Sequence, residues 1–447
     1  MEVLPAEILA LLMDHLLDNQ LLPVSMVCKR WRHLLFSMCH RSVRSGLALA
    51  AQFGYMSLIL WYVDVLHFPT HTICVHAAKG GQSQVLLWAR GRGCKWNASV
   101  TSAAAQAGRL ITLQWLHDRG CKITMDAFHQ ATASGQLTTL QWLASIGFRP
   151  STRNALMHAC SHGQLKIAKW LVETFGAHFD KSICSLAAGG GHLTTLQWLV
   201  SSGCGWSRFT CSAAAAGGYL EVLKWAHENG CPWSSSTCST AAQSGHLKTL
   251  QWARRMNCPW DSSTCRGAAA GGHLKVLKWA RANGCPWDIE TCKAAAENGY
   301  LSVLKWAREN DCDWGKGKEV CERAASRGYL TIVQWARENG AEWTCSTFAA
   351  AAAGGFLPLL KWLRQNNCPW DENVIVYSER YGYKEALHWA IEEGFPCPWW
   401  LSKKMGIEPR KRRNRGPLEQ QATQDDDNEE AEMSSEDDEW NDNTMEL

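Results

Sequence analysis

Residues 214–233 read AAAGGYLEVLKWAHENGCPW, and the chain repeats this pattern along most of its length. The Trp of the LKW segment has counterparts at positions 61, 88, 115, 142, 170, 198, 225, 252, 279, 306, 335, 362 and 389. Nine of the twelve intervals are 27 residues, and the others are 28, 28 and 29. A fixed period of this size is typical of a solenoid, in which each unit buries its apolar face against its neighbours.

A Gly stands seven residues before each of these thirteen Trp residues, as Gly245 does before Trp252. Gly adopts positive φ without steric cost, so this position predicts a tight turn. An Ala-rich run precedes the Gly and an amphipathic run follows it, which together predict helix, turn and helix. The second helix should end in the left-handed region at the next Gly, Asn or Asp. These residues are Gly93, Gly120, Gly203, Gly230, Gly284, Gly340, Asn257, Asp311 and Asn367.

The unit resembles an ankyrin repeat, as residues 295–314 (AAENGYLSVLKWARENDCDW) illustrate. The Ala pair, the Gly, the Tyr-Leu pair and the helix that ends near Asn match the core pattern of that family. The units here are shorter than the family's, and Ser236-Thr237-Cys238 stands where the family has TPLH. The resemblance therefore implies a helical repeat in which a plain loop replaces the projecting hairpin.

The first forty residues interrupt the period with two segments whose apolar residues have helical spacing. They resemble an F-box from Val3 to Phe36, with the motifs Leu4-Pro5-Ala6-Glu7-Ile8 and Val27-Cys28-Lys29-Arg30-Trp31. The resemblance implies a three-helix domain that docks on a Skp-type adaptor of a cullin-RING ubiquitin ligase. Its docking residues would be Leu4, Pro5, Ile8, Leu9, Leu12, Val27 and Trp31. The alternative is that these helices only cap the first repeat.

The composition changes after Trp400, where basic residues precede an acidic end. The basic cluster is Arg410, Lys411, Arg412, Arg413 and Arg415, which suits either a nuclear localisation signal or a solvated linker. From Asp425 the chain is acidic, has almost nothing to bury and should be disordered. The chain is thus predicted to be all-α in three parts. These are an F-box at 1–42, an ankyrin-like solenoid of about 13 short repeats at 43–400, and the basic cluster with its acidic tail at 401–447.

Twenty Cys residues raise the question of disulfides and metal sites, since many recur at repeat positions, as Cys231 and Cys238 do. Equivalent Cys residues of stacked helices lie about 8–10 Å apart, whereas a disulfide needs Cα atoms within about 7 Å. Neither a CxxC pair nor a Cys/His knuckle suggests zinc. We therefore expect buried, reduced thiols, with no metal and no cofactor.

Motifs of catalysis and of membrane insertion are missing from the sequence. There is no GxSxG, Walker or HExxH pattern. His192, His246 and His273 follow the turn Gly, where we expect turn and capping contacts. No segment has the length and apolar character of a signal peptide or a membrane span. These observations predict a non-enzymatic intracellular protein, cytoplasmic and, if the basic cluster acts as a signal, also nuclear.

A second Trp series stands eight residues after the first, at 96, 206, 233, 260, 287, 314, 343 and 370. These indoles either pack in the core between repeats or form an exposed ladder for a peptide or for nucleic acid bases. A periodic Trp in a repeat favours the core. The net charge of +3 combines the basic cluster, the acidic tail and a folded body, whose positive charge is too dilute to argue strongly for nucleic acid.

The combination predicts a substrate receptor that has no chemistry of its own. The F-box would hold the ligase, and the repeats would hold a target protein close to it. A binding scaffold without a ligase is the alternative, and nucleic-acid binding is a third. Chains of this type resemble the F-box and ankyrin proteins of large DNA viruses of amoebae, which are thought to redirect host ubiquitin ligases.

Overall fold

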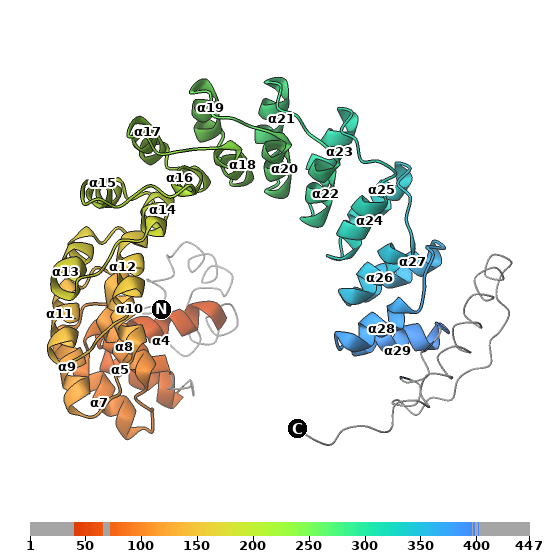
Figure 1. Cartoon of the computed structure of the whole chain (residues 1–447). Coiled ribbons are helices and arrows are strands. Elements are labelled where there is room, and N and C mark those ends of the chain that lie inside the picture. Colours follow the sequence, from red (N-terminus) through yellow and green to blue (C-terminus); the bar gives the residue numbers. More distant parts are fainter. Residues whose placement is uncertain (1–39, 66–71, 396, 398–400, 402–447) are drawn as a thin grey trace, which may run out of the picture. The chain divides into compact units, whose positions relative to one another are not determined.

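A computed structural model of the 447-residue chain describes residues 40–65, 72–395, 397 and 401 (Figure 1). These residues form helices, turns and loops, and no strand occurs among them. The predicted all-α fold of paired helices is therefore confirmed, including the plain loop between repeats. Nearly all of the predicted F-box, the basic cluster and the acidic tail lie outside the described residues.

Helices alternate between an Ala-rich type and a Trp-bearing type, in step with the sequence period. The first type comprises α4 (His40–Phe53), α6 (Ile73–Gly80), α8 (Ala98–Gln106), α10 (Met125–Ala133), α12 (Thr152–Ser161), α14 (Lys181–Gly189), α16 (Thr210–Gly217), α18 (Ser235–Gln243), α20 (Ser262–Ala270), α22 (Ile289–Glu297), α24 (Lys318–Ala325), α26 (Cys345–Ala353) and α28 (Asn373–Arg380). The second type comprises α5 (Met56–Leu60) with the π-helix η1 (Trp61–Val65), α7 (Ser83–Gly91), α9 (Leu110–Asp118), α11 (Leu137–Ser145), α13 (Leu165–Phe175), α15 (Leu193–Ser201), α17 (Leu220–Glu228), α19 (Leu247–Arg255), α21 (Leu274–Ala282), α23 (Leu301–Glu309), α25 (Leu330–Glu338), α27 (Leu357–Gln365) and α29 (Lys384–Glu392).

Residues with left-handed backbone conformation occur where the sequence predicts them. Each Gly that stands seven residues before a Trp has positive φ, as Gly245 does at +80°. Each predicted C-terminal residue of the second helix does too, including Asn257 at 58°, Asp311 at 62° and Asn367 at 57°. These are the only non-Gly residues with positive φ in the described part of the chain. Asn and Asp tolerate this conformation better than other side chains do, which explains their place there.

Two helical layers enclose the core within each compact unit. Successive even-numbered helices pack on one another, while each odd-numbered helix covers its own partner (Figure 1). Alanines such as Ala241 and Ala268 are fully buried between even-numbered helices, and Leu250 and Leu277 fill the space between the layers. The even-numbered helices lie so close that a β-carbon on Gly271 would be 2.0 Å from the carbonyl oxygen of Gln243. The close approach at Gly271 is a property of this joint between repeats, because the equivalent C-cap residues of α12 and α22 are His162 and Asn298.

Within each compact unit, the residue after a turn Gly connects neighbouring repeats. Its side chain lies over the turn Gly of the preceding repeat, where a β-carbon on Gly245 would be 2.5 Å from the His273 ring. His246 lies over Gly218 and His192 over Gly163 in the same way. The ring of His192 also lies within hydrogen-bonding distance of the Ser161 carbonyl, 3.1 Å from Nε2. All three His residues thus lie at turns, as predicted, but none of their side chains makes a capping hydrogen bond to its own helix.

The described chain divides into two compact units, one up to Trp314 and one from Gly315. The division falls in the longest Trp interval, the 29 residues from Trp306 to Trp335. Gly315 and Gly317 both have positive φ, at 58° and 75°, in the segment that carries the two extra residues. In the second unit the Glu342 amide donates to the Lys316 carbonyl at 2.8 Å. None of the helices in the described ranges is long and apolar enough to cross a membrane.

Candidate protein-binding surface

The two Trp series pack against each other across the joint between repeats. Six of the eight loop Trp residues contact the helix Trp of the next repeat, nineteen residues later in the chain. The ring centroids of Trp260 and Trp279 are 6.0 Å apart at an interplanar angle of 63°. Similar contacts, with centroids 5.3 to 5.9 Å apart, join Trp96–Trp115, Trp206–Trp225, Trp233–Trp252, Trp287–Trp306 and Trp343–Trp362. Such tilted pairs add stability beyond the area that they bury.

An Arg two residues after the helix Trp covers the loop Trp of its own repeat. The guanidinium carbon of Arg254 lies 4.1 Å from the Trp260 ring centroid, and Arg281 lies 4.2 Å from that of Trp287. These Arg side chains also donate to the carbonyl four residues on, as Arg281 does to Cys285 at 2.5 Å. We call this recurring set of two indoles and one guanidinium the Trp–Arg ladder. Both a cation–π contact and a hydrogen bond fix it in the repeats of Arg254, Arg281, Arg308 and Arg337.

The indoles of the Trp–Arg ladder are neither core nor fully open. Nearly all of the described ones are half-buried, and only Trp314 and Trp389 are buried, at 5% and 9% exposure. The expectation that the second Trp series belongs to the core is thus wrong for most of its members. The physical reason is that the loop holds each indole at the rim of the joint, where one part contacts the next repeat and another part contacts water.

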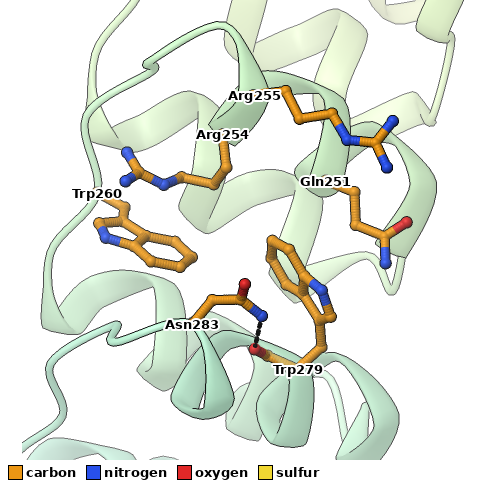
Figure 2. Close-up of a pocket in the computed structure, with 6 residues that line it drawn as sticks. All are labelled: Gln251, Arg254, Arg255, Trp260, Trp279 and Asn283. Atoms are coloured by element: carbon orange, nitrogen blue, oxygen red, sulfur yellow. Dashed lines mark hydrogen bonds between the residues drawn. The ribbon is translucent and has the colours of Figure 1, made fainter.

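A pocket of about 330 Å³ lies on the Trp–Arg ladder between α19 and α21 (Figure 2). Its lining consists of Gln251, Arg254, Arg255, Trp260, Trp279 and Asn283. The guanidinium of Arg254 donates to the Cys258 carbonyl, and the Asn283 amide donates to the Trp279 carbonyl at 2.8 Å. Arg255 is exposed and has no ion-pair partner among the described residues. The pocket therefore combines two fixed indoles with one cation that is free to bind a ligand.

The Cys residues form pairs that the sequence reasoning missed. The Cys184 thiol donates to the Cys204 sulfur at 3.2 Å, within one repeat, and both are buried. That hydrogen bond, together with burial, raises the pKa of the Cys184 thiol. The same pairing raises the pKa of the first thiol in Cys211/Cys231, Cys238/Cys258 and Cys265/Cys285. The signal in the sequence was the recurring separation of 20 residues between two Cys residues. The first Cys lies near the start of an Ala-rich helix, and the second lies in the loop after the Trp-bearing helix of the same repeat, as Cys184 and Cys204 do.

Buried thiols predict that the repeats lose stability in alkali. Burial raises the pKa of Cys160 from its ordinary 9.0 to about 12, so the folded chain keeps the proton that the unfolded chain releases. The stabilising effect is complete below pH 9.0 and is lost as the pH rises towards about 12. Between pH 9.0 and about 12, we expect the free energy of unfolding to fall by about 1 kcal/mol per pH unit for each such thiol. Urea titrations at a series of pH values measure this slope. Cys160→Ala should reduce this slope, and an unchanged slope would contradict the assignment.

The residues predicted to bind an adaptor or to direct localisation are not placed by the structure. Leu4, Pro5, Ile8, Leu9, Leu12, Val27 and Trp31 lie outside the described residues, as do Arg410, Lys411, Arg412, Arg413 and Arg415. Within the described ranges, no group of three or more His, Cys, Asp or Glu side chains is arranged to hold a metal ion. The pocket residues Arg254, Arg255 and Asn283 were not predicted from the sequence. Recurrence was a signal for two of them, because an Arg often stands two residues after the helix Trp and an Asn four residues after it. Arg255 has no such series.

Comparison with known families finds matches in two parts of the chain. The model of the F-box-like family matches residues 1–41, and the model for ankyrin repeats in three copies matches residues 101–183. Residues 101–183 therefore match ankyrin repeats. An F-box-like segment precedes these ankyrin repeats, and both families are binding modules without catalytic activity.

Among solved structures, these ankyrin repeats are similar to the crystal structure of the human ASB11 ankyrin repeat domain. The sequence identity is 16%, the match covers 36% of this chain and 84% of that chain, and the TM-score is 0.29. Comparison with curated proteins finds no matching sequence. None of these comparisons supports the viral resemblance, which stays a prediction from the sequence.

Proposed function

We propose that the chain is a non-catalytic substrate receptor of a cullin-RING ubiquitin ligase. The observation that carries this proposal is the presence of both binding modules in one chain, the F-box-like segment at residues 1–41 and the ankyrin repeats matched at residues 101–183. An F-box implies a Skp-type adaptor, and ankyrin repeats bind proteins. Residues 1–42 then dock on the adaptor and residues 43–400 hold the target, so the ligase acts on the target by proximity.

The docking residues of the proposal are Leu4, Pro5, Ile8, Leu9, Leu12, Val27 and Trp31. Pro5 and Trp31 represent the opening and closing motifs of the segment. An aromatic anchor of this kind commonly contributes 2 kcal/mol or more to an interface, by order of magnitude, so its loss weakens binding roughly tenfold or more. The basic cluster from Arg410 to Arg415 is proposed to direct the receptor to the nucleus.

Capture of the full chain by an immobilised Skp-type adaptor tests the function. We expect the wild-type chain to be retained and the Pro5→Ala/Trp31→Ala variant to lose about tenfold in retained protein. Lys166→Glu/Lys169→Glu, two exposed changes on α13, is the folded control and should be retained as the wild type is. If the adaptor does not capture the wild-type chain, the ligase link is wrong. The scaffold that binds proteins without a ligase then replaces it.

A further inference from the structure

Basic side chains gather on α19 and α21 without acidic ones between them. The helices read LKTLQWARR and LKVLKWARA, which contain no Asp or Glu. We call their cations the basic face, which consists of Lys248, Arg254, Arg255, Lys275, Lys278 and Arg281. Lys248, Arg255, Lys275 and Lys278 are exposed. None of the six forms an ion pair within the described part of the chain.

The neighbouring odd-numbered helices differ from the basic face in their charge. In α17, Glu221 pairs with Lys224 at 2.8 Å, and Glu228 adds a second acid. In α23, Glu309 stands at the helix position that Arg255 occupies in α19. Among the odd-numbered helices, α19 and α21 therefore carry the largest excess of positive charge, three cations each without an acid. Unpaired cations concentrated on one side of a fold favour an acidic partner.

The acids nearest in sequence to the basic face are engaged elsewhere. Asp261 accepts a hydrogen bond from the Ser263 amide at 3.0 Å, and Asp288 accepts one from the Glu290 amide at 3.1 Å. These contacts place the two carboxylates at the N-termini of α20 and α22, where they stabilise the helices. They leave the charge of the basic face available to a ligand.

The pocket between α19 and α21 favours a protein ligand over a nucleic acid. Stacking platforms for bases need open aromatic faces. Here the Arg254 guanidinium already covers a face of Trp260, and the Trp279 ring lies at 63° to that indole (Figure 2). A base would have to displace the guanidinium, which also donates to the Cys258 carbonyl. An acidic side chain can instead reach the exposed Arg255 at the pocket without disturbing these contacts.

The spacing of the repeats suggests the form of the ligand. Helices that pack side by side are about 8–10 Å apart, and an extended chain advances about 3.3 Å per residue. About three residues of an extended segment therefore span one repeat. A segment with carboxylates at every third position would place them opposite equivalent cations of α19 and α21.

We propose that the basic face binds an extended acidic segment of a partner protein, with carboxylates three residues apart, one of which reaches Arg255 at the pocket. This proposal rests on the proposed function in one respect, because it takes the segment to be the recognition element of the target. The binding chemistry does not depend on the ligase.

Fluorescence anisotropy of a labelled peptide with Glu at every third position and Leu between them tests the proposal on the full chain. We expect it to bind about tenfold more tightly than the same peptide with Gln in place of Glu, and to weaken between ionic strengths of about 0.02 and 0.15 M. Two probes test the alternatives. A peptide of residues 425–439 has contiguous acids, and an oligo-dT tests nucleic acid. The proposal is overturned if the Gln peptide binds equally well, or if either alternative binds more tightly than the spaced peptide.

Matched charge reversals locate the site. Lys275→Glu/Lys278→Glu changes the second and fifth residues of α21, and Lys166→Glu/Lys169→Glu changes the same positions of α13. All four Lys side chains are exposed, so both variants should fold. We expect the α21 variant to lose about tenfold in peptide affinity, Arg255→Ala to lose severalfold, and the α13 variant to stay near the wild type. Equal losses in the α13 and α21 variants would show a general charge effect and overturn the site.

Adaptor capture of the same preparations separates the two proposals. We expect the α21 variant to bind the Skp-type adaptor as the wild type does, because the substitutions are outside residues 1–42. If the adaptor is not captured but the spaced peptide still binds at the basic face, the receptor function is wrong and the peptide site stands.

Discussion

Gly245→Ala is expected to destabilise the repeats by about 2–4 kcal/mol, and Gly230→Ala by only about 1–2 kcal/mol. Both residues have positive φ, at 80° and 77°, so both substitutions strain the backbone. They differ in their surroundings. A β-carbon on Gly245 would lie 2.5 Å from the His273 ring, whereas one on Gly230 would have nothing within 4 Å. The difference between the two variants measures the contact between repeats. It can be read from urea titrations followed by circular dichroism.

Removing the His273 ring tests the cause of that difference. If the collision is the reason, Gly245→Ala should be less harmful in a His273→Ala background than in the wild type, by about 1 kcal/mol. His246→Ala serves as the matched control, because that ring lies over Gly218 in the preceding joint. Additive effects of Gly245→Ala and His273→Ala would mean that only the backbone conformation requires Gly at this position.

Gly271→Ala is expected to destabilise the Ala-rich layer by about 1–3 kcal/mol, although Ala is the better helix former. Gly271 has φ of −87°, so the substitution causes no backbone strain. The added β-carbon would lie 2.0 Å from the Gln243 carbonyl oxygen, which belongs to the backbone of α18 and cannot rotate away. Helices α18 and α20 would have to separate, which disturbs the packing along both.

Gly91→Ala is the matched control for this second substitution. Gly91 ends α7, and a β-carbon there would have nothing within 4 Å. Without a collision, the propensity of Ala should leave stability unchanged or raise it by up to about 1 kcal/mol. Thermal unfolding of both variants gives the comparison. Equal effects at Gly91 and Gly271 would contradict the close approach of α18 and α20.

The period of the sequence was enough to predict the repeat itself, because its signals are local. A Gly such as Gly245 indicates a turn because Gly adopts positive φ without steric cost. Asn257 indicates a helix end because Asn also tolerates positive φ. Neither prediction requires knowledge of the neighbouring repeat. The fold class and the left-handed positions could therefore be predicted from single units.

Contacts that depend on how the repeats fold and pack could not be predicted in this way. The contact of Trp260 with Trp279 depends on how far the loop of one repeat is offset from the helix of the next, and that offset follows from helix packing. The position of Cys184 next to Cys204 required the fold of a whole repeat, because the argument from spacing compared only equivalent residues. The basic face has no motif at all, since it depends on which exposed positions of α19 and α21 lack acids. Pro5 and Trp31 stay predictions from resemblance.

The joints described above also bear on how a gene for such a chain changes length. Gly245-His246 and Gly272-His273 are the same dipeptide at the same point of consecutive repeats. Unequal crossing-over that removes residues 246–272 would connect Gly245 directly to His273 and place that His over Gly218, as His246 is now. At the new junction, the Gly-His turn sequence and the contact of the His ring with the preceding turn Gly would both be unchanged. Recombination can thus add or remove whole units here and alter the reach of the protein while every remaining contact keeps its partner type.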